Sequence, residues 1–206
     1  MNIITISREF GSGGRELGKR LAEAMGYAYY DRELITAIAE KSDFNEQYVE
    51  RVLESGMPQN FTVTFRSTFT AVPAPIQQSV TRIMVLQQQI LKEVAGRENC
   101  VIVGRSADAI LADCHPFNIF VYADMEAKLR RCRERAPEGE TLTDAELRRK
   151  IRQVDQGRIQ HHRMMSDLKW GDKEGYHLCI NTTDSPIKAL VPAVAQYAEA
   201  WFAVER

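Results

Sequence analysis

The chain has 206 residues, of which 44% are hydrophobic, and its formal net charge is −1. This length and composition predict one globular domain with a sizeable core, and the balanced charge argues against a nucleic-acid partner. No apolar run approaches the roughly 20 residues that cross a bilayer. Because a strand pattern already begins at residue 3, we also expect no signal peptide. These features predict a cytoplasmic protein without a membrane partner.

Cysteine and histidine spacing argues against a metal site built by the protein. The four cysteines are scattered without a C-x-x-C pair, and the four histidines show no ligand spacing. We therefore expect reduced thiols, with neither zinc nor a disulfide framework.

The N-terminal stretch ITISREFGSGGRELGKRLAE is a strand, a glycine turn and a helix in that order. Glycines at 11, 13 and 14 let the backbone curl closely around a ligand. A curl at a helix N-terminus directs several N–H groups into one concavity, which suits phosphate. The alternative is a glycine-rich turn that binds nothing.

This stretch departs from the P-loop pattern G-x-x-x-x-G-K-[ST]. If Gly13 is the last glycine of that pattern, Gly14 stands at the lysine position and Arg15 at the hydroxyl position. Arg8 stands where the first glycine would be. The glycines fit phosphate binding, whereas the cation and the magnesium-binding hydroxyl are missing.

Residues 27–30 form a short predicted strand that ends at Asp31 and Arg32. Ligands of open α/β sheets bind at the carboxyl ends of the strands, so both side chains are candidates for a ligand site. Asp31 is also a good N-cap for the helix DRELITAIAEKS, and capping alone would explain its residue type.

The next part of the chain is predicted to be largely helical. Short and long helices are expected over residues 45–53 and 76–96, separated by the irregular segment 57–75. Phenylalanines at four-residue spacing in that segment predict a substrate-facing flap, an oligomer contact or a loop packed on the body.

The buried-type strand 100–103 leads directly into Gly104, Arg105 and, slightly later, Asp108. An arginine at the carboxyl end of a strand faces the same crevice as the glycine turn. Its planar guanidinium suits a substrate phosphate. The alternative is a surface arginine that caps the strand.

An arginine-rich helical region follows the strand 117–122. One helix begins near residue 126, and a second begins with a capping box from Thr143 to Glu146. Arg152, Asp155 and Arg158 share a face of the second helix. This face predicts a lid over nucleotide phosphates, although charge runs are often simply solvated. The histidines at 161 and 162 are expected on the lid surface.

A last strand, 176–182, and a last helix, 185–204, complete the pattern. Five strands that alternate with helices predict an α/β fold with a parallel sheet covered on both faces.

Taken together, these segments resemble the cytidylate kinase-like proteins, a branch of the P-loop nucleoside monophosphate kinases. The resemblance covers nearly the whole chain and rests on ITISREFGSGGRELGKRLAE, YYDREL, VIVGRSADAIL, FVYADMEAKLRRCRER, the D-x-x-R from Asp155 to Arg158, and YHLCINTT. A loop without lysine is that branch's form.

The resemblance implies a P-loop NTPase fold with a five-stranded parallel sheet flanked by helices. It divides one kinase-like domain, 1–206, into three parts. These are a core, a helical nucleoside-monophosphate-binding insert and a lid; their ranges are 1–30, 98–135 and 175–206 for the core, 31–97 for the insert and 136–165 for the lid.

The resemblance also implies roles for individual residues. The donor phosphates would lie on the loop, whose predicted contacts are Arg8, Gly11, Ser12, Gly13, Gly14, Arg15 and Glu16. The acceptor would be bound by Asp31, Arg32, Arg105, Asp108, Arg130, Arg152 and Asp155. The transferring group would be stabilised by Arg15, Arg105, Arg131 and Arg158. Cytidylate kinases proper carry an arginine four residues before the aspartate that corresponds to Asp155; Ile151 stands there, beside Arg152.

The expected activity is ATP-dependent phosphoryl transfer to CMP or dCMP, with Mg²⁺ held mainly by nucleotide oxygens and water. Ser12, Glu16 and Asp31 are the predicted outer contacts of that ion. A kinase of another small acceptor and a nucleotide-binding regulator without turnover are the alternatives. The partners are therefore a nucleotide and a small acceptor, and a homodimer is left open.

Overall fold

The structure is a computed structural model that describes residues 1–55 and 74–204. Phe61, Phe65 and Phe69 of the predicted flap or oligomer contact lie outside the described residues.

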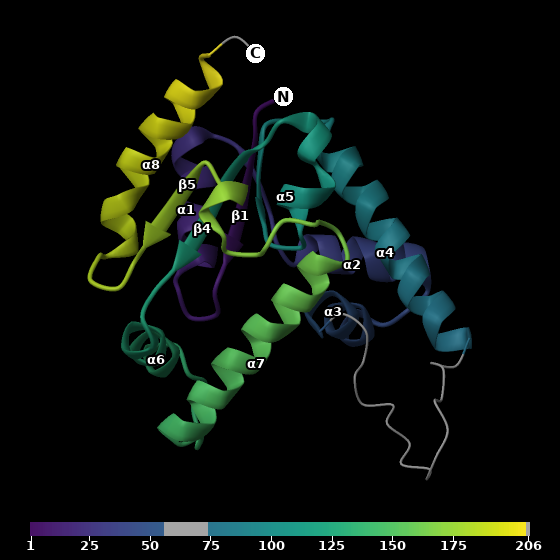
Figure 1. Cartoon of the computed structure of the whole chain (residues 1–206), viewed down its shortest axis with the longest axis horizontal. Coiled ribbons are helices and arrows are strands. Elements are labelled where there is room, and N and C mark those ends of the chain that lie inside the picture. The colour runs from purple at the N-terminus through teal and green to yellow at the C-terminus, as the bar shows by residue number, and fades with distance from the viewer. Residues whose placement is uncertain (56–73, 205–206) are drawn as a thin grey trace.

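A five-stranded sheet with the order β2-β3-β1-β4-β5 forms the centre of the molecule (Figure 1). All neighbouring strands run parallel, as the alternation of strands and helices predicts. The strands are β1 (Ile3–Arg8), β2 (Ala28–Tyr30), β3 (Cys100–Val103), β4 (Phe117–Tyr122) and β5 (Leu178–Asn181).

Helices cover both faces of this sheet. One face packs on α1 and α8, and the other on α2 to α5 (Figure 1). These helices are α1 (Gly14–Met25), α2 (Glu33–Ser42), α3 (Glu46–Ser55), α4 (Ala74–Ala95), α5 (Ala107–Ile110) and α8 (Ile187–Phe202). Short 3₁₀ turns occur at Ala112–Cys114 and Lys173–Gly175.

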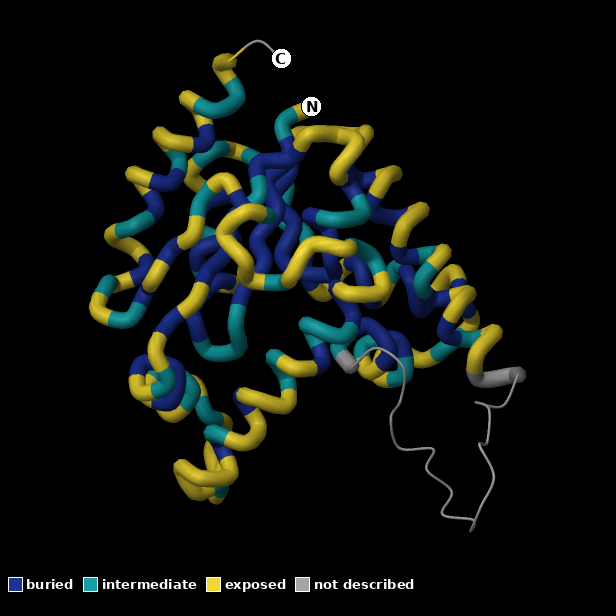
Figure 2. The backbone as a smooth tube through the Cα atoms, viewed as in Figure 1, coloured by how far each residue is buried: buried dark blue, intermediate teal, exposed yellow. Residues whose placement is uncertain are grey.

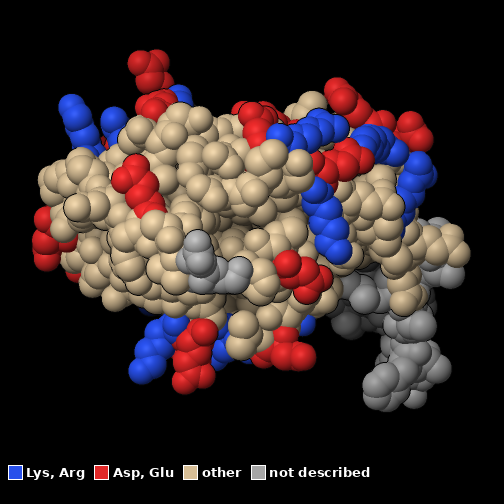
Figure 3. Space-filling view, turned by 90° about the horizontal axis from the view of Figure 1, so that it is seen from above, with Lys and Arg blue, Asp and Glu red and all other residues tan. Residues whose placement is uncertain are grey.

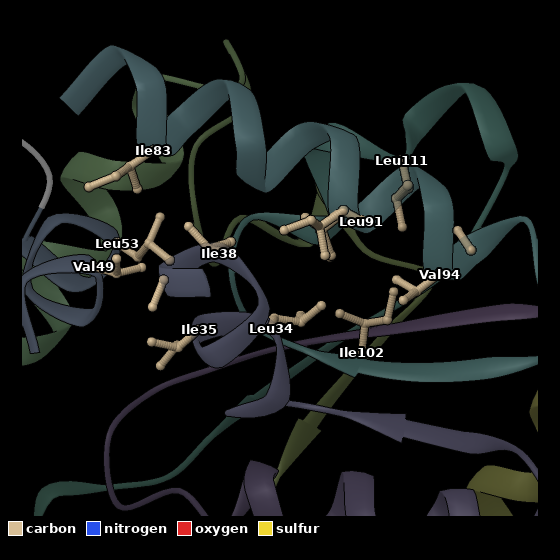
Figure 4. Packing of buried hydrophobic residues seen from close by; sticks show 14 of the residues in the cluster. Leu34, Ile35, Ile38, Val49, Leu53, Ile83, Leu91, Val94, Ile102 and Leu111 are labelled. Atoms are coloured by element: carbon tan, nitrogen blue, oxygen red, sulfur yellow. The ribbon is translucent and has the colours of Figure 1, made fainter. Parts of the chain in front are cut away.

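Side chains alternate between the two faces along the central strands. Val101 and Val103 of β3 join the cluster beneath α1 and α8, whereas Ile102 packs on α2 and α4 (Figure 4). Because both faces are covered, β1 and β3 are buried along their whole length, as Figure 2 shows.

Two helices lie beyond the carboxyl edge of the sheet. They are α6 (Met125–Glu134) and α7 (Asp144–Arg163), and α7 packs against α3 (Figure 1). The predicted capping box is confirmed, because the Thr143 side chain accepts from Glu146 N–H and the Glu146 side chain accepts from the Thr143 backbone. The end of β1 lies close to the C-terminal half of α7, where Arg158 donates to the Arg8 carbonyl.

The described residues contain no helix long and apolar enough to cross a membrane. On the face shown in Figure 3, acidic and basic side chains are interspersed and are separated by uncharged surface.

Close packing of α1 on the sheet depends on Gly18. A Cβ at this position would lie 2.6 Å from Val103 Cγ2 and 3.1 Å from Ile6 Cδ1, and both neighbours are fully buried. We expect Gly18→Val to lower the free energy of unfolding by about 2 kcal/mol or more, because the core has no room for the added carbons. Urea denaturation measures this loss.

Lys19→Val is the matched control, because it places the same side chain at an exposed position of the same helix. It should cost less than about 1 kcal/mol. Equal losses in the two variants would show that close packing at Gly18 is unimportant.

Candidate active site

The glycine turn between β1 and α1 forms an open concavity at the carboxyl edge of the sheet. Gly11 and Gly13 have φ values of 77° and 86°, in the left-handed region that favours glycine. Gly13 is the N-cap of α1. The first N–H groups of a helix have no intrahelical acceptor, so this end of α1 can bind an anion.

Ser12 holds the turn together from inside. Its hydroxyl donates to the Glu9 carbonyl at 2.8 Å, and its carbonyl accepts from the Thr182 hydroxyl at 2.7 Å. Ser12 and Thr182 are both fully buried. The Ser12 hydroxyl is thus used within the protein, although we predicted it as an outer contact of magnesium.

Arg131 of α6 fastens the same turn to the end of β5. Its Nη1 lies 3.5 Å from the Ser12 carbonyl and 3.2 Å from Thr182 Oγ1, and its Nη2 donates to the Thr182 carbonyl. Arg130 donates to the Thr183 carbonyl at 3.4 Å. Both arginines line a groove of about 430 Å³ beside the turn, together with Glu16 and Pro186.

Arg15, which we predicted to stabilise the transferring group, forms an ion pair with Asp31. The distance from Arg15 Nε to Asp31 Oδ2 is 2.6 Å, and Asp31 is buried whereas the Arg15 side chain is 57% exposed. The prediction that Asp31 is the N-cap of α2 is wrong. Arg32 takes that position, because Asp31 turns inward to the arginines.

Three guanidinium groups gather where β1, β3 and α7 meet. They belong to Arg8 and Arg105, which are buried, and to Arg158, whose side chain is 13% exposed. Arg158 Nη1 donates to the Arg8 carbonyl at 2.9 Å, and Arg8 Nη2 lies 3.9 Å from Asp31 Oδ1. We call Arg8, Arg105 and Arg158 the arginine cluster.

The arginine cluster brings three positive charges into a largely buried place. Burial, followed by the charges of Arg158 and Arg105, lowers the pKa of Arg8 well below its ordinary value. Burial likewise lowers the pKa of Arg105 and of Arg158. Within the described residues, Arg105 Nε and Nη2 have no hydrogen-bond partner. Such a cluster can bind an anion with charge-assisted hydrogen bonds.

Asp155 connects α7 to the turn. Its Oδ1 accepts from the Phe10 N–H at 2.7 Å, and Arg158 lies 3.6 Å away. Its Oδ2 lies 3.5 Å from Lys128 Nζ, which is 2.5 Å from Glu9. Burial raises the pKa of Asp155 despite these cations. Asp155, which we predicted to bind the acceptor, is thus held against the turn, Arg158 and Lys128.

A cavity of about 430 Å³ lies between the turn, α3, α6 and α7. The predicted residues that line it are Arg8, Gly11, Gly13, Gly14, Arg15, Arg131 and Arg158. Glu50 and Glu54 of α3 form part of its opposite wall. Glu54 also contacts a small space beside Arg8, Arg105 and Arg158.

None of the seven predicted acceptor residues is among those that line this cavity. Arg105 borders the small space instead, and Arg130 borders the groove beside the turn. Arg32 and Arg152 are exposed, and neither lines the cavity. Asp108 is buried and lines a separate cavity of about 140 Å³, where its Oδ2 lies 3.0 Å from His162 Nε2.

The prediction that His161 and His162 lie on the lid surface is wrong. Both are at least 97% buried, because this end of α7 turns toward the loop after β3. Burial, followed by the charge of Arg105, lowers the pKa of His161 to about 4. Its imidazole is therefore neutral at physiological pH.

Sequence reasoning missed Lys128, Thr182 and the acidic pair on α3. Lys128 lies on the buried face of α6 with Leu129 and Cys132, so a charged residue at a core-facing helix position was the available signal. Glu50 and Glu54 share a helix face at four-residue spacing. Thr182 gave no comparable signal.

Comparison with known proteins identifies the family to which this chain belongs. Residues 3–184 match the Cytidylate kinase-like family. No curated protein matches the chain.

Solved structures share the fold over almost the whole chain. An uncharacterized protein from Eubacterium ventriosum ATCC 27560 is 25% identical with a TM-score of 0.70, covering 97% of this chain and 99% of the other. Shikimate kinase from Bacteroides thetaiotaomicron is 18% identical, with a TM-score of 0.56 and coverage of 98% and 99%. A gluconokinase from Sinorhizobium meliloti 1021 is 14% identical, with a TM-score of 0.54 and coverage of 98% and 95%.

The five-stranded parallel sheet with its flanking helices is thus the fold of P-loop small-molecule kinases. By the match over residues 3–184, this chain belongs to the Cytidylate kinase-like family.

Proposed function

We propose that the protein transfers a phosphoryl group from ATP to a nucleoside monophosphate, with CMP or dCMP as the first candidates. The observation that carries the proposal is the arginine cluster beside an anion-binding helix terminus, because a kinase must hold two phosphorylated molecules in contact. Family membership supports the same reaction class.

The donor phosphates are assigned to the turn from Gly11 to Arg15. Its backbone N–H groups and the N-terminus of α1 favour negative charge there. We assign the rest of the nucleotide to the groove lined by Arg130, Arg131 and Pro186, since this groove adjoins the turn.

The acceptor phosphate is assigned to the arginine cluster. The unpartnered Nε and Nη2 of Arg105 are its expected donors, and Arg8 and Arg158 neutralise charge on the transferring group. An acceptor phosphate oxyanion needs no general base, so positioning and neutralisation suffice. In this assignment, 31–97 is the acceptor-binding insert and 136–165 is the lid.

Magnesium fits this site through one carboxylate. Asp31 Oδ1 is buried without a hydrogen-bond partner among the described residues, whereas Glu16 is paired with Arg20 and Arg135. Asp31 would hold the ion together with nucleotide oxygens and water, and the ion would neutralise phosphate charge.

The missing loop lysine is the main energetic cost of this assignment. Losing one contact to the developing charge costs on the order of 10²–10³ in rate. Four arginines around the cavity can offset that loss. They are Arg8, Arg15, Arg131 and Arg158.

A kinase of a hydroxylated small molecule is the second candidate. Glu50 and Glu54 place carboxylates opposite the arginines, where they could accept hydrogen bonds from hydroxyl groups. Such an acceptor needs a base, and Glu54, which borders both spaces, has suitable chemistry.

A regulator without turnover is the third candidate, and the absent lysine favours it.

An ADP-release assay over a panel of acceptors separates the three candidates. We expect turnover with ATP and CMP or dCMP, and little with hydroxylated acids or sugars. Turnover with a hydroxylated acceptor alone would favour the second candidate. Nucleotide binding by calorimetry without ADP release from any acceptor would favour the regulator.

Arg158→Gln tests the arginine cluster. We expect kcat/KM to fall on the order of 10²–10³-fold, because a buried cation facing the transferring group is lost. Arg163→Gln removes an exposed charge from the same helix and should change kcat/KM less than twofold. If both variants keep wild-type rates and melting temperatures, Arg158 has no role in transfer.

Arg15→Ala tests the substitute for the loop lysine. We expect kcat/KM to fall at least tenfold while the circular-dichroism spectrum and melting curve stay close to wild type, since the Arg15 side chain is largely exposed. Lys19→Ala, at an exposed position one turn further along α1, should leave the rate unchanged. An unchanged rate in Arg15→Ala would exclude Arg15 from catalysis.

A further inference from the structure

The loop after β3 has an unusual backbone. Gly104, Arg105 and Ser106 follow one another with φ values of 75°, 61° and 49°. Glycine adopts this left-handed region freely, whereas an arginine or a serine there costs about 1–2 kcal/mol. The surrounding structure must therefore hold Arg105 and Ser106 in place.

A chain of side-chain hydrogen bonds spans this turn. Gln87 Nε2 donates to the Arg105 carbonyl, and Gln87 Oε1 lies 3.2 Å from His161 Nε2. His161 Nδ1 lies 2.9 Å from Ser106 Oγ, which closes the chain on the residue after Arg105. All four residues are more than 90% buried. We call this arrangement the Gln87–His161 bridge.

The hydrogen-bond directions in the bridge follow from the Gln87 amide and from the neutral imidazole of His161, whose pKa burial lowers to about 4. An amide nitrogen must donate to a carbonyl, so the oxygen of Gln87 is left to accept from His161. His161 therefore carries its proton on Nε2, and its Nδ1 accepts from the Ser106 hydroxyl. This requires a neutral imidazole, in agreement with the low pKa of His161.

The bridge joins elements that are distant in sequence. Gln87 lies on α4, and His161 on α7, beyond the carboxyl edge of the sheet. Gln87 occupies a core-facing position between Ile83 and Leu91, which point into the packed interface below α4 (Figure 4). A buried glutamine in that apolar row is explained by its contacts with Arg105 and His161.

Arg105 depends on this support more than the other cluster members do. Arg158 is held by the Arg8 carbonyl and Asp155, and Arg8 lies beside Asp31. Within the described residues, two guanidinium nitrogens of Arg105 have no partner. The left-handed turn sets the direction in which the Arg105 side chain leaves the backbone, and these two nitrogens are left for a ligand.

We infer that Gln87 and His161 are positioning residues, which hold the left-handed turn so that the guanidinium of Arg105 meets the acceptor phosphate. This inference rests on the proposed function, in which Arg105 binds that phosphate. Arg105 borders the small space that it shares with Arg8 and Arg158, whereas Gln87 borders neither this space nor the main cavity and contacts the Arg105 carbonyl from behind. Its effect on acceptor binding therefore acts through Arg105.

Gln87→Met tests this inference, because it keeps the length of the side chain and removes both hydrogen bonds. We expect the affinities for CMP and for inorganic phosphate, measured by titration calorimetry, to fall at least tenfold. Affinity for ATP should stay within twofold of wild type. A merely structural role would lower the melting temperature and leave both affinities of the folded protein unchanged.

Gln89→Met is the matched control, since Gln89 is exposed on the same helix. It should change neither affinity. Ser106→Ala is a smaller change and serves as a second test if Gln87→Met folds poorly. It should lower the affinities for CMP and for phosphate, as Gln87→Met does. Nitrogen-15 spectra of His161 give an independent readout. We expect a neutral Nε2–H tautomer in the wild type and a changed Nδ1 signal in Ser106→Ala.

The possible failures are distinguishable. If wild type binds phosphate and CMP but releases no ADP, the proposed kinase activity fails while the affinities still test the bridge. Equal CMP and phosphate affinities in wild type and Gln87→Met would overturn the positioning role. An Nδ1–H tautomer in the wild type would overturn the bridge itself.

Discussion

The concentration of positive charge at the carboxyl edge of the sheet is the constraint on which the site depends. Arg8, Arg105 and Arg158 approach one another in a buried place, where like charges repel strongly and water cannot screen them. Folding must tolerate this repulsion, and burial lowers the pKa of each guanidinium. A bound phosphate would relieve the repulsion, which is the physical basis of the proposed acceptor site.

Nearby carboxylates orient the cations and neutralise part of their charge. Asp31 pairs with Arg15, and Asp155 joins Phe10 N–H to Arg158. Glu9 and Asp155 hold Lys128 beneath the turn. Lys128 lines no part of the main cavity, so this buried lysine does not replace the lysine of a P-loop. In the proposed function that task falls to arginines, whose side chains come from β1, α1, α6 and α7.

The similarity to known proteins indicates the class of reaction, but it does not identify the acceptor. Family membership and the shared fold indicate a small-molecule kinase, and structures below 25% identity support the fold alone. Glu50 and Glu54 of α3 line the same cavity as Arg8, Arg15 and Arg158. Under the proposed function, these carboxylates favour an acceptor that has hydrogen-bond donors as well as a phosphate or another anion.

The sequence by itself determined the order of strands and helices, the glycine turn at the N-terminus of α1, and the place of Arg105 at the end of a strand. Each of these three features can be recognised from residues that are close in sequence. Apolar periodicity indicates the strands and helices, glycine content indicates the turn, and the position just after a strand indicates Arg105. The family resemblance also implied a role for Arg158 beside the transferring group. In the structure, Arg158 of α7 donates to the Arg8 carbonyl.

Only the tertiary structure decided which charged groups pair and which face the cavity. Arg15 pairs with Asp31, Ser12 points inward to Thr182, and His161 is buried against Ser106. Ser12 and Thr182 are separated by 170 positions, and Ser106 and His161 by 55. Long polar side chains reach several alternative partners, and no local pattern specifies which partner the fold brings within hydrogen-bonding distance. The left-handed turn at Arg105 also depends on residues distant in sequence, because Gln87 of α4 and His161 of α7 support it.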